Sequence, residues 1–226
     1  MTRKIRGPKK DFFEEELETF LEFVQKGGKV LFMMDPFYTL PKFSAFLSNF
    51  DVVLGNNVII DRYNRSFGGD DFVILVPFFR KNPITQDFEA PALFPLARSI
   101  EVKRTPKKGI FAKTFAMSTP ESWAVSDKKD FTGGEIRFQE GVDKKGPVLI
   151  AAIVILAVKQ RRRVIEEERA EGQMVIYGDS DFINNFYIDY LGNKDLFLNT
   201  VNWMSGDEYQ IFIHLGSKGL NTLIDS

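Results

Sequence analysis

The residues best suited to chemistry gather in one short stretch, residues 178–181 (GDSD), which contains Ser180. A serine acts as a nucleophile when a base takes its proton, most often a histidine that an acid orients. The chain has a single histidine, His214, and the residue three positions before it is Ile211, so no Asp-x-x-His pair accompanies Ser180. Cysteine is absent, which removes thiolate catalysis, disulfides and Cys-ligated metal sites. We therefore expect this stretch to cap a following helix rather than to catalyse a reaction.

Acidic residues are the second set of candidates, because several carboxylates that converge can bind a divalent cation. No EF-hand loop connects them, and one histidine cannot make a multi-histidine metal site. We interpret the acids as separate turn and cap residues and expect neither a metal nor a cofactor. These acidic residues are Asp35, Asp61, Asp70, Asp71, Asp179 and Asp181.

A shared polar patch is the remaining possibility for a functional site. Asp35 follows one continuous apolar stretch, and residues 179–181 follow another. If both stretches are parallel strands of one sheet, their carboxyl ends meet at the same edge, where ligands bind in open parallel sheets. The alternative is that each Asp caps only its own helix and no shared patch forms. The candidate ligand or partner patch consists of Asp35, Asp179, Ser180, Asp181, Asn184 and Asn185.

Hydrophobic periodicity predicts the elements that would position this patch. Residues 11–26 form an amphipathic helix with Phe13, Leu17, Phe20 and Val24 on one face, and Asp11 has capping spacing to Glu14. Further helices are expected at residues 40–50 and 193–204, the latter with Asn193 as its N-cap. Strands are expected at residues 29–36, 57–61, 147–158, 174–178 and 210–214, and residues 159–173 read as a solvated charged segment.

Helices and buried strands in this order predict an α/β fold. We expect a single α/β domain over residues 1–226, with a strand-rich insertion or subdomain at residues 62–146. Lys and Arg total 30 against 31 Asp and Glu, so no basic field favours nucleic acid. No signal peptide is visible, and the longest apolar run, residues 148–158, is far shorter than a membrane helix. The chain as written is expected to be soluble.

Nine segments, taken in order, resemble one family. They are GPKKDF (7–12), the GGKVLFMMDP block (27–36), NNVIID (56–61), NPIT (82–85), ARS (97–99), STPESW (118–123), GP (146–147), GDSDFINN (178–185) and NTVNWM (199–204). Together they resemble the extracytoplasmic domain of the GldG-type auxiliary proteins of ABC transport systems, which are linked to gliding motility. The family usually has a histidine where this chain has Asn82, so any role of that histidine is absent here.

The resemblance implies a class I glutamine amidotransferase-like (flavodoxin-like) fold with a mostly parallel central sheet flanked by helices. Relatives have a further helix and strand before the GP turn at Gly7, so we expect the sheet to be incomplete on its N-terminal side. The resemblance also implies a permease and an ATPase as partners and membrane-spanning segments outside this chain. A related domain in an intraflagellar transport subunit serves assembly.

The function expected from these observations is that of a non-catalytic auxiliary domain at the cell membrane, on the extracytoplasmic side, which contacts proteins or substrate. Glutamine amidotransferase chemistry is excluded because its cysteine nucleophile is missing. The alternative is a small-molecule or carbohydrate-processing domain with an unrecognised active site.

Overall fold

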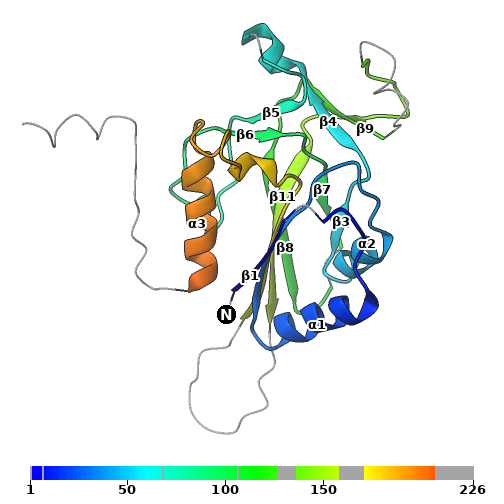
Figure 1. The fold of residues 1–226 in the computed structure, drawn as a ribbon, viewed down its shortest axis with the longest axis vertical. Helices are drawn as coiled ribbons and strands as arrows, with labels where there is room; N and C mark the ends of the chain where they lie inside the picture. Colours follow the sequence, from blue (N-terminus) through cyan, green and yellow to red (C-terminus); the bar gives the residue numbers. More distant parts are fainter. Residues whose placement is uncertain are drawn as a thin grey trace, which may run out of the picture.

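A five-stranded sheet forms the centre of the molecule (Figure 1). The computed structural model describes residues 2–6, 8–67, 69–105, 107–126, 136–157 and 171–206. The strand order in this sheet is β1-β2-β12-β11-β8. Its strands are β1 (Thr2–Arg6), β2 (Lys29–Met33), β8 (Ile110–Met117), β11 (Leu149–Ala157) and β12 (Glu171–Tyr177).

Strand direction changes in the middle of the sheet. The strands β1, β2 and β12 are parallel to one another, whereas β11 is antiparallel to β12 and β8 is antiparallel to β11. Three smaller sheets are wholly antiparallel. The first contains β10 (Lys144–Lys145), β9 (Ser122–Val125) and β4 (Val58–Asp61). The second pairs β3 (Val52–Leu54) with β7 (Ile100–Val102), and the third pairs β5 (Val73–Val76) with β6 (Ala92–Pro95).

The prediction of a mostly parallel, flavodoxin-like α/β fold is therefore wrong. Strands dominate the described residues, and the sheets are mixed and largely antiparallel. The error has a physical origin. A strand covered on both faces is apolar throughout whichever way it runs, so the apolar stretches at residues 148–158 and 174–178 carried no information about direction. The expected resemblance to class I glutamine amidotransferases rested on that parallel fold, and the structure does not support it.

Helices cover both faces of the central sheet. They are α1 (Glu14–Gln25), α2 (Pro41–Ser48) and α3 (Asn193–Ser205), with 3-10 turns η1 (Arg62–Phe67) and η3 (Asp181–Ile183). Figure 1 shows α1 and α2 on one side of the sheet and α3 on the other. Alternate side chains of each central strand consequently enter two separate cores.

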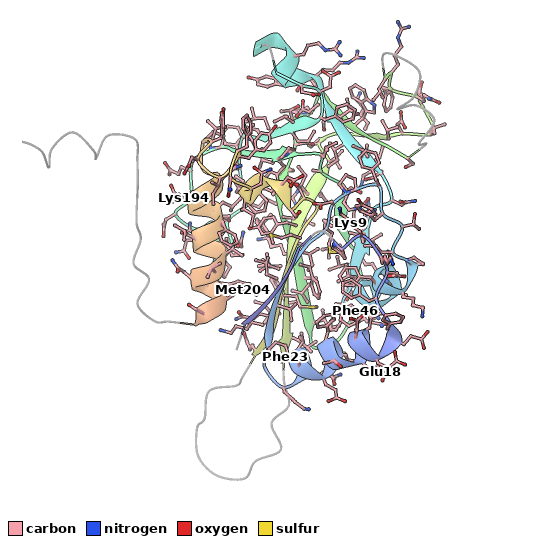
Figure 2. The ribbon with its side chains drawn as sticks, viewed as in Figure 1. Lys9, Glu18, Phe23, Phe46, Lys194 and Met204 are labelled. Carbon is pink, nitrogen blue, oxygen red and sulfur yellow. The ribbon has the colours of Figure 1, made fainter. Side chains whose placement is uncertain are left out.

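The first core lies between the sheet and α1, α2, β3 and β7. Val30 and Phe32 of β2 meet Phe43 and Phe46 of α2 there, and Figure 2 labels Phe46 beside the sheet. Phe32 and Phe43 have ring centroids 4.9 Å apart. A chain of such aromatic contacts accounts for part of the high phenylalanine content.

The second core lies on the opposite face, beneath α3, η3 and the β5–β6 pair. Leu31 and Met33 of β2 point into it, as do Phe115 of β8 and Tyr177 of β12. Figure 2 shows Met204 of α3 on the side of the helix that faces the sheet. Strands from the region predicted as an insertion thus contribute to the cores, and the division at residues 62–146 stays a prediction.

The first predicted helix is present, but its start differs from expectation. Leu17 and Val24 are buried, and Phe20 is half-buried against the first core, as the helical face predicted. Phe13 is instead the N-cap residue, 71% exposed, and its backbone N–H donates to Glu16 Oε2 at 2.8 Å. Asp11 caps α2 rather than α1, since its carboxylate accepts the Lys42 N–H at 2.7 Å.

Other expected elements can be compared in the same way. The predicted helices at residues 40–50 and 193–204 correspond to α2 and α3, and the strands at 29–36, 57–61, 147–158 and 174–178 to β2, β4, β11 and β12. The predicted strand at 210–214, which contains His214, lies outside the described residues. Most of the charged segment at 159–173 also lies outside them.

Candidate functional site

Two of the predicted patch residues meet at the carboxyl ends of β2 and β12. These strands pair in parallel, with Met33 opposite Tyr177, and the Met34 N–H extends the ladder by donating to Tyr177 O at 2.9 Å. The Asp35 carboxylate then accepts the Ser180 N–H at 2.7 Å through Oδ1 and the Ser180 hydroxyl at 3.0 Å through Oδ2. Asp35 and the loop after β12 therefore lie on the same edge of the sheet, as expected.

Asp179 faces inward from the same loop. Its side chain accepts the Asp181 N–H at 2.7 Å and the Phe182 N–H at 3.0 Å, which caps the η3 turn. The residue is 1% exposed, and this burial raises the pKa of the Asp179 carboxyl well above its ordinary value. The two N–H donors oppose that rise, and the negative charges of Asp35 and Asp181 add to it. The helix-cap interpretation fits this residue.

Ser180 is arranged as a structural link rather than as an activated nucleophile. Its hydroxyl donates to a carboxylate, whereas an activated serine donates to a histidine that removes its proton. The side chain is 2% exposed, so a substrate would have to displace its surroundings to reach it. The sole histidine, His214, lies outside the described residues.

Arg98 is the residue of this edge that sequence reasoning missed. It is 1% exposed, and its guanidinium donates one hydrogen bond, to Tyr38 O at 3.2 Å, while Nε and Nη1 have no hydrogen-bond partner. Burial lowers the pKa of Arg98 to about 10, and the negative charge of Asp35 acts in the opposite direction. Arg98 thus remains a cation at neutral pH, and Asp35 supplies the nearby counter-charge.

The backbone of Arg98 also fixes the loop that carries Ser180. Its N–H donates to Gly178 O at 2.8 Å, and the Gly178 N–H donates to Ile150 O at 2.8 Å. A Cβ at Gly178 would collide with the Arg98 carbonyl oxygen, so only glycine fits at this position. The sequence did contain one signal of this residue, because Arg98 stands among small and apolar residues at 97–100. An arginine buried in such surroundings requires a carboxylate nearby to balance its charge.

The outer members of the predicted patch lie nearer the surface. Asp181 and Asn184 are half-buried, and Asn185 is exposed. The Asn184 side-chain oxygen accepts the N–H groups of Phe186 at 2.8 Å and Tyr187 at 2.9 Å, which shapes the segment between η3 and α3. The patch is therefore divided into a buried, hydrogen-bonded half at Asp179 and Ser180 and an outer half that leads into this segment.

Asn193 organises that segment from beneath, and its predicted role as a helix cap is wrong. Gly192 is the N-cap of α3, and no side chain caps it. The fully buried Asn193 side chain instead bonds both the N–H and the carbonyl of Leu93, at 2.8 and 3.0 Å. It also donates to Phe182 O at 2.9 Å and Tyr187 O at 3.0 Å. One amide thus ties β6 to the loop after β12.

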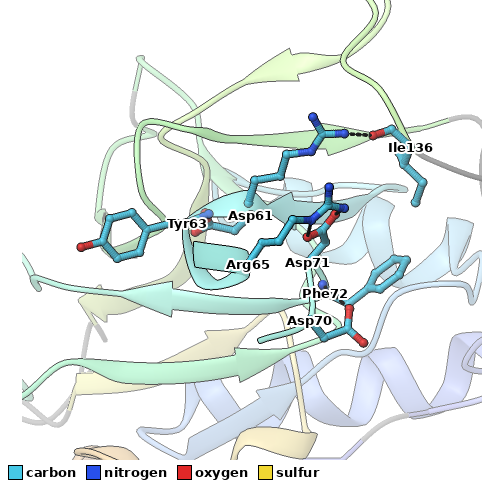
Figure 3. A network of polar contacts seen from close by, with 8 residues as sticks. Asp61, Tyr63, Arg65, Asp70, Asp71, Phe72 and Ile136 are labelled. Carbon is cyan, nitrogen blue, oxygen red and sulfur yellow. Dashed lines mark hydrogen bonds and ion pairs between the residues drawn. The ribbon is translucent and has the colours of Figure 1, made fainter. Parts of the chain in front are cut away.

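The remaining acidic candidates lie around η1, between β4 and β5, and are drawn in Figure 3. Asp61 Oδ1 accepts the Tyr63 N–H at 3.0 Å and the Thr119 hydroxyl at 2.9 Å, and Asp71 forms a two-pronged ion pair with Arg65. Asp70 accepts the Phe72 N–H at 3.0 Å. Within the described part of the chain, no group of three or more His, Cys, Asp or Glu could hold a metal ion.

Other recognisable segments have comparable structural tasks. Asn82 of the NPIT segment accepts the Ile84 N–H at 2.9 Å and donates to Arg80 O at 2.9 Å, so it builds a turn in this segment. Ser122 of the STPESW segment accepts the Gly146 N–H at 2.8 Å through its carbonyl. These residues fold loops onto the sheet rather than form a second site.

Comparison with known proteins places this geometry in a family. A family model described as "ABC-type uncharacterized transport system" matches residues 5–200. No curated protein sequence matches the chain. Among solved structures, the chain is similar to the "mmIFT52 N-terminal domain" with a TM-score of 0.63 at 12% sequence identity, and the match covers 92% of this chain and 78% of that one. In the described residues, no helix is long and apolar enough to cross a membrane.

Proposed function

Because the chain belongs to the family of ABC-type uncharacterized transport systems, we propose that it is a non-catalytic auxiliary domain that acts through contacts with other proteins. One observation carries this proposal. At the sheet edge where a ligand site was expected, Asp35, Asp179 and Ser180 are engaged in hydrogen bonds within the protein. Asp179 and Ser180 are buried and Asp35 is half-buried, and groups already hydrogen-bonded in this way stabilise a loop and are poorly placed to bind or convert a substrate.

We further propose that the partners are the permease and the ATPase of the same transport system and that the domain faces the extracytoplasmic side. The family description supports an association with a membrane transport system. The chain shares its fold with the IFT52 N-terminal domain, so this fold occurs in more than one protein. Membrane attachment would come from segments beyond residues 1–226.

Co-purification tests the partner proposal. The full-length protein, carrying an affinity tag, is isolated from its native membranes in mild detergent, and the co-eluting proteins are identified by mass spectrometry. We expect a permease and an ATPase in near-stoichiometric amounts. Recovery of the protein alone, after chemical crosslinking in intact cells as well, would contradict the proposal.

Site-directed labelling tests the side of the membrane. The chain has no cysteine, so Glu18→Cys on the exposed surface of α1 (labelled in Figure 2) introduces a unique thiol in this domain. A maleimide that cannot cross the inner membrane should label this variant in intact cells. Labelling only after the membrane is permeabilised would place the domain on the cytoplasmic side and overturn this part of the proposal.

A further inference from the structure

Three aromatic side chains form a compact surface cluster between η3 and α3, in the gold-to-orange part of Figure 1. The ring centroid of Phe186 lies 4.9 Å from that of Tyr187 and 5.5 Å from that of Tyr190, and the two tyrosine rings are 6.1 Å apart. Phe186 is 65% exposed and Tyr190 is 47% exposed. Phe186 and Tyr190 are stacked, and Phe186 meets Tyr187 edge to face. An exposed set of aromatic rings in mutual contact is unusual on a protein surface and typically marks a binding site.

The cluster is held in place by the protein rather than carried on a loose segment. Asn184 accepts the N–H groups of Phe186 and Tyr187, and Asn193 donates to the Tyr187 carbonyl from the core side. The Tyr190 N–H donates to that same carbonyl at 3.1 Å. These bonds fix the backbone that carries the rings before any partner arrives, which reduces the entropy that binding would lose.

The surroundings of the cluster are acidic. The Tyr187 hydroxyl lies in the field of Asp70, Asp179 and Asp181, which come from the loop before β5 and the loop after β12. Partial burial and these charges raise the pKa of Tyr187, so the phenol is neutral at physiological pH. Asp189 is exposed within the segment itself, and its carboxylate lies 3.9 Å from Lys194 Nζ.

We propose that the rings of Phe186, Tyr187 and Tyr190, with the carboxylates of Asp70 and Asp181 near Tyr187 and that of Asp189 in the same segment, are a docking surface for arginine side chains of a basic segment in a partner protein. A guanidinium stacks on aromatic faces through its planar π-system and its charge, and nearby carboxylates add attraction. The inference rests on the proposed function, because it names the chemistry of a protein partner for an interaction domain.

Charge complementarity selects this occupant among those that aromatic rings can bind. A neutral carbohydrate could stack on the rings and donate its hydroxyls to the aspartates, but it would leave their negative charges uncompensated. An anionic membrane surface would be repelled by them. A basic protein segment uses both the rings and the charges, so it accounts for both features of the surface.

An NMR titration of the 226-residue chain tests the inference. The probe is an acetylated, amidated peptide of alternating arginine and glycine, and the control is the same peptide with citrulline, which has nearly the same shape but no charge. We expect saturable shifts of the amide signals of residues 184–191 with the arginine peptide. The citrulline peptide should bind at least tenfold more weakly.

Three variants separate the contributions of rings and charges. Phe186→Ala combined with Tyr190→Ala should weaken binding of the arginine peptide at least tenfold. Asp70→Asn, Asp181→Asn and Asp189→Asn together remove three charges and should also weaken binding and flatten its salt dependence. Phe111→Ala removes a ring that is 53% exposed near the opposite end of the sheet, and should leave binding unchanged. Thermal melting verifies that each variant is folded.

The outcomes are distinct. Equal binding of the citrulline peptide, shifts confined to other residues, or unchanged affinity in either multiple variant would overturn the inference. So would saturable binding of maltohexaose or of phosphatidylglycerol vesicles at these rings in place of the peptide. If the double aromatic variant of the full-length protein still co-purifies with the permease, the surface is wrong but the proposed function stands. If the unaltered protein recovers no partner, the proposed function itself fails.

Discussion

Asp35 and Ser180, 145 residues apart in sequence, are joined by two hydrogen bonds in which one carboxylate accepts both the backbone N–H and the hydroxyl of the serine. The pair closes the end of the parallel strands β2 and β12. Arg98 lies beside it as a buried cation, two of whose nitrogens lack a hydrogen-bond partner. The same carboxylate thus serves the loop geometry and the charge balance of the interior.

The first prediction concerns that charge balance. Asp35→Asn keeps the size of the side chain but removes the charge opposite Arg98, and should lower the free energy of unfolding by about 3 kcal/mol. In an Arg98→Met background the same change should cost roughly 1–2 kcal/mol less, because the buried cation is gone. Urea denaturation of the four proteins measures this coupling. Additive costs of the two single changes would show that Asp35 does not stabilise Arg98. The control is Asp87→Asn, which removes a carboxylate from the exposed surface.

The second prediction concerns pH. Burial, helped by the charge of Glu121, raises the pKa of Asp61 above its ordinary value of 3.8, although three hydrogen bonds oppose this. The unfolded chain therefore ionises first as the pH rises, so the cost of Asp61 to the stability of the folded state grows from about pH 4 until the pH passes the folded pKa, and it stays at that level above it. Below that window the carboxyl is protonated in both states and carries no such cost.

Asp61→Asn should remove this cost. Asn retains an oxygen to accept the Tyr63 and Thr119 donors, and its amide replaces Oδ2, which has no hydrogen-bond partner. We expect the variant to gain stability relative to the unaltered protein as the pH rises from 3 to 7, by about 1.4 kcal/mol for each unit of pKa shift. Denaturant melts at several pH values measure the difference. A stability difference that does not vary with pH would contradict the prediction.

The third prediction compares two asparagines of the same region. Asn193→Ala removes a fully buried amide that bonds Leu93, Phe182 and Tyr187, and should cost about 2–4 kcal/mol because several backbone groups lose their partner. Asn185→Ala alters an exposed side chain and should change stability by less than about 0.5 kcal/mol. Equal melting temperatures of the two variants would show that Asn193 is not the organiser of this loop.

The fourth prediction compares two phenylalanines of the first core. Phe43 is fully buried with its ring centroid 4.9 Å from those of Phe12 and Phe32, so Phe43→Ala should cost about 3–5 kcal/mol. Phe20 is only half-buried against the same core, and Phe20→Ala should cost about 1–2 kcal/mol less. Chemical denaturation measures both, and a larger loss for Phe20 would mean that α1 contributes more to this core than α2 does.

Element positions were largely accessible from the sequence because they depend on local periodicity. The helix containing Leu17 and Val24 and the apolar strand containing Phe32 follow from the spacing of apolar residues. Strand direction was not accessible, since it depends on long-range pairing such as that of Ala151 with Tyr177. A run that is apolar at every position fits either direction equally well.

The candidate site shows a similar division. The shared edge of Asp35 and Ser180 could be predicted because both follow apolar strands. The proximity of Arg98 to Asp35, and the bond from Asn193 to the Phe182 carbonyl in the same loop, could not be predicted, because these partners come from distant segments whose placement no local pattern encodes. A polar residue in an apolar context signals that a partner exists, but it does not say which one.

The parallel pairing of β2 with β12 also sets the order in which this protein can be assembled. Lys29 pairs with Gln173, so during synthesis β2 emerges long before the strand beside which it lies. At a translation rate of about 5–20 residues per second, β12 is synthesised on the order of ten seconds after β2. The strand β1 precedes β2 and pairs with one of its edges, but pairings as distant in sequence as that with β12 are slow to form, and until then the other edge of this apolar strand is open to aggregation. We expect the nascent chain to depend on chaperones until β12 has been made.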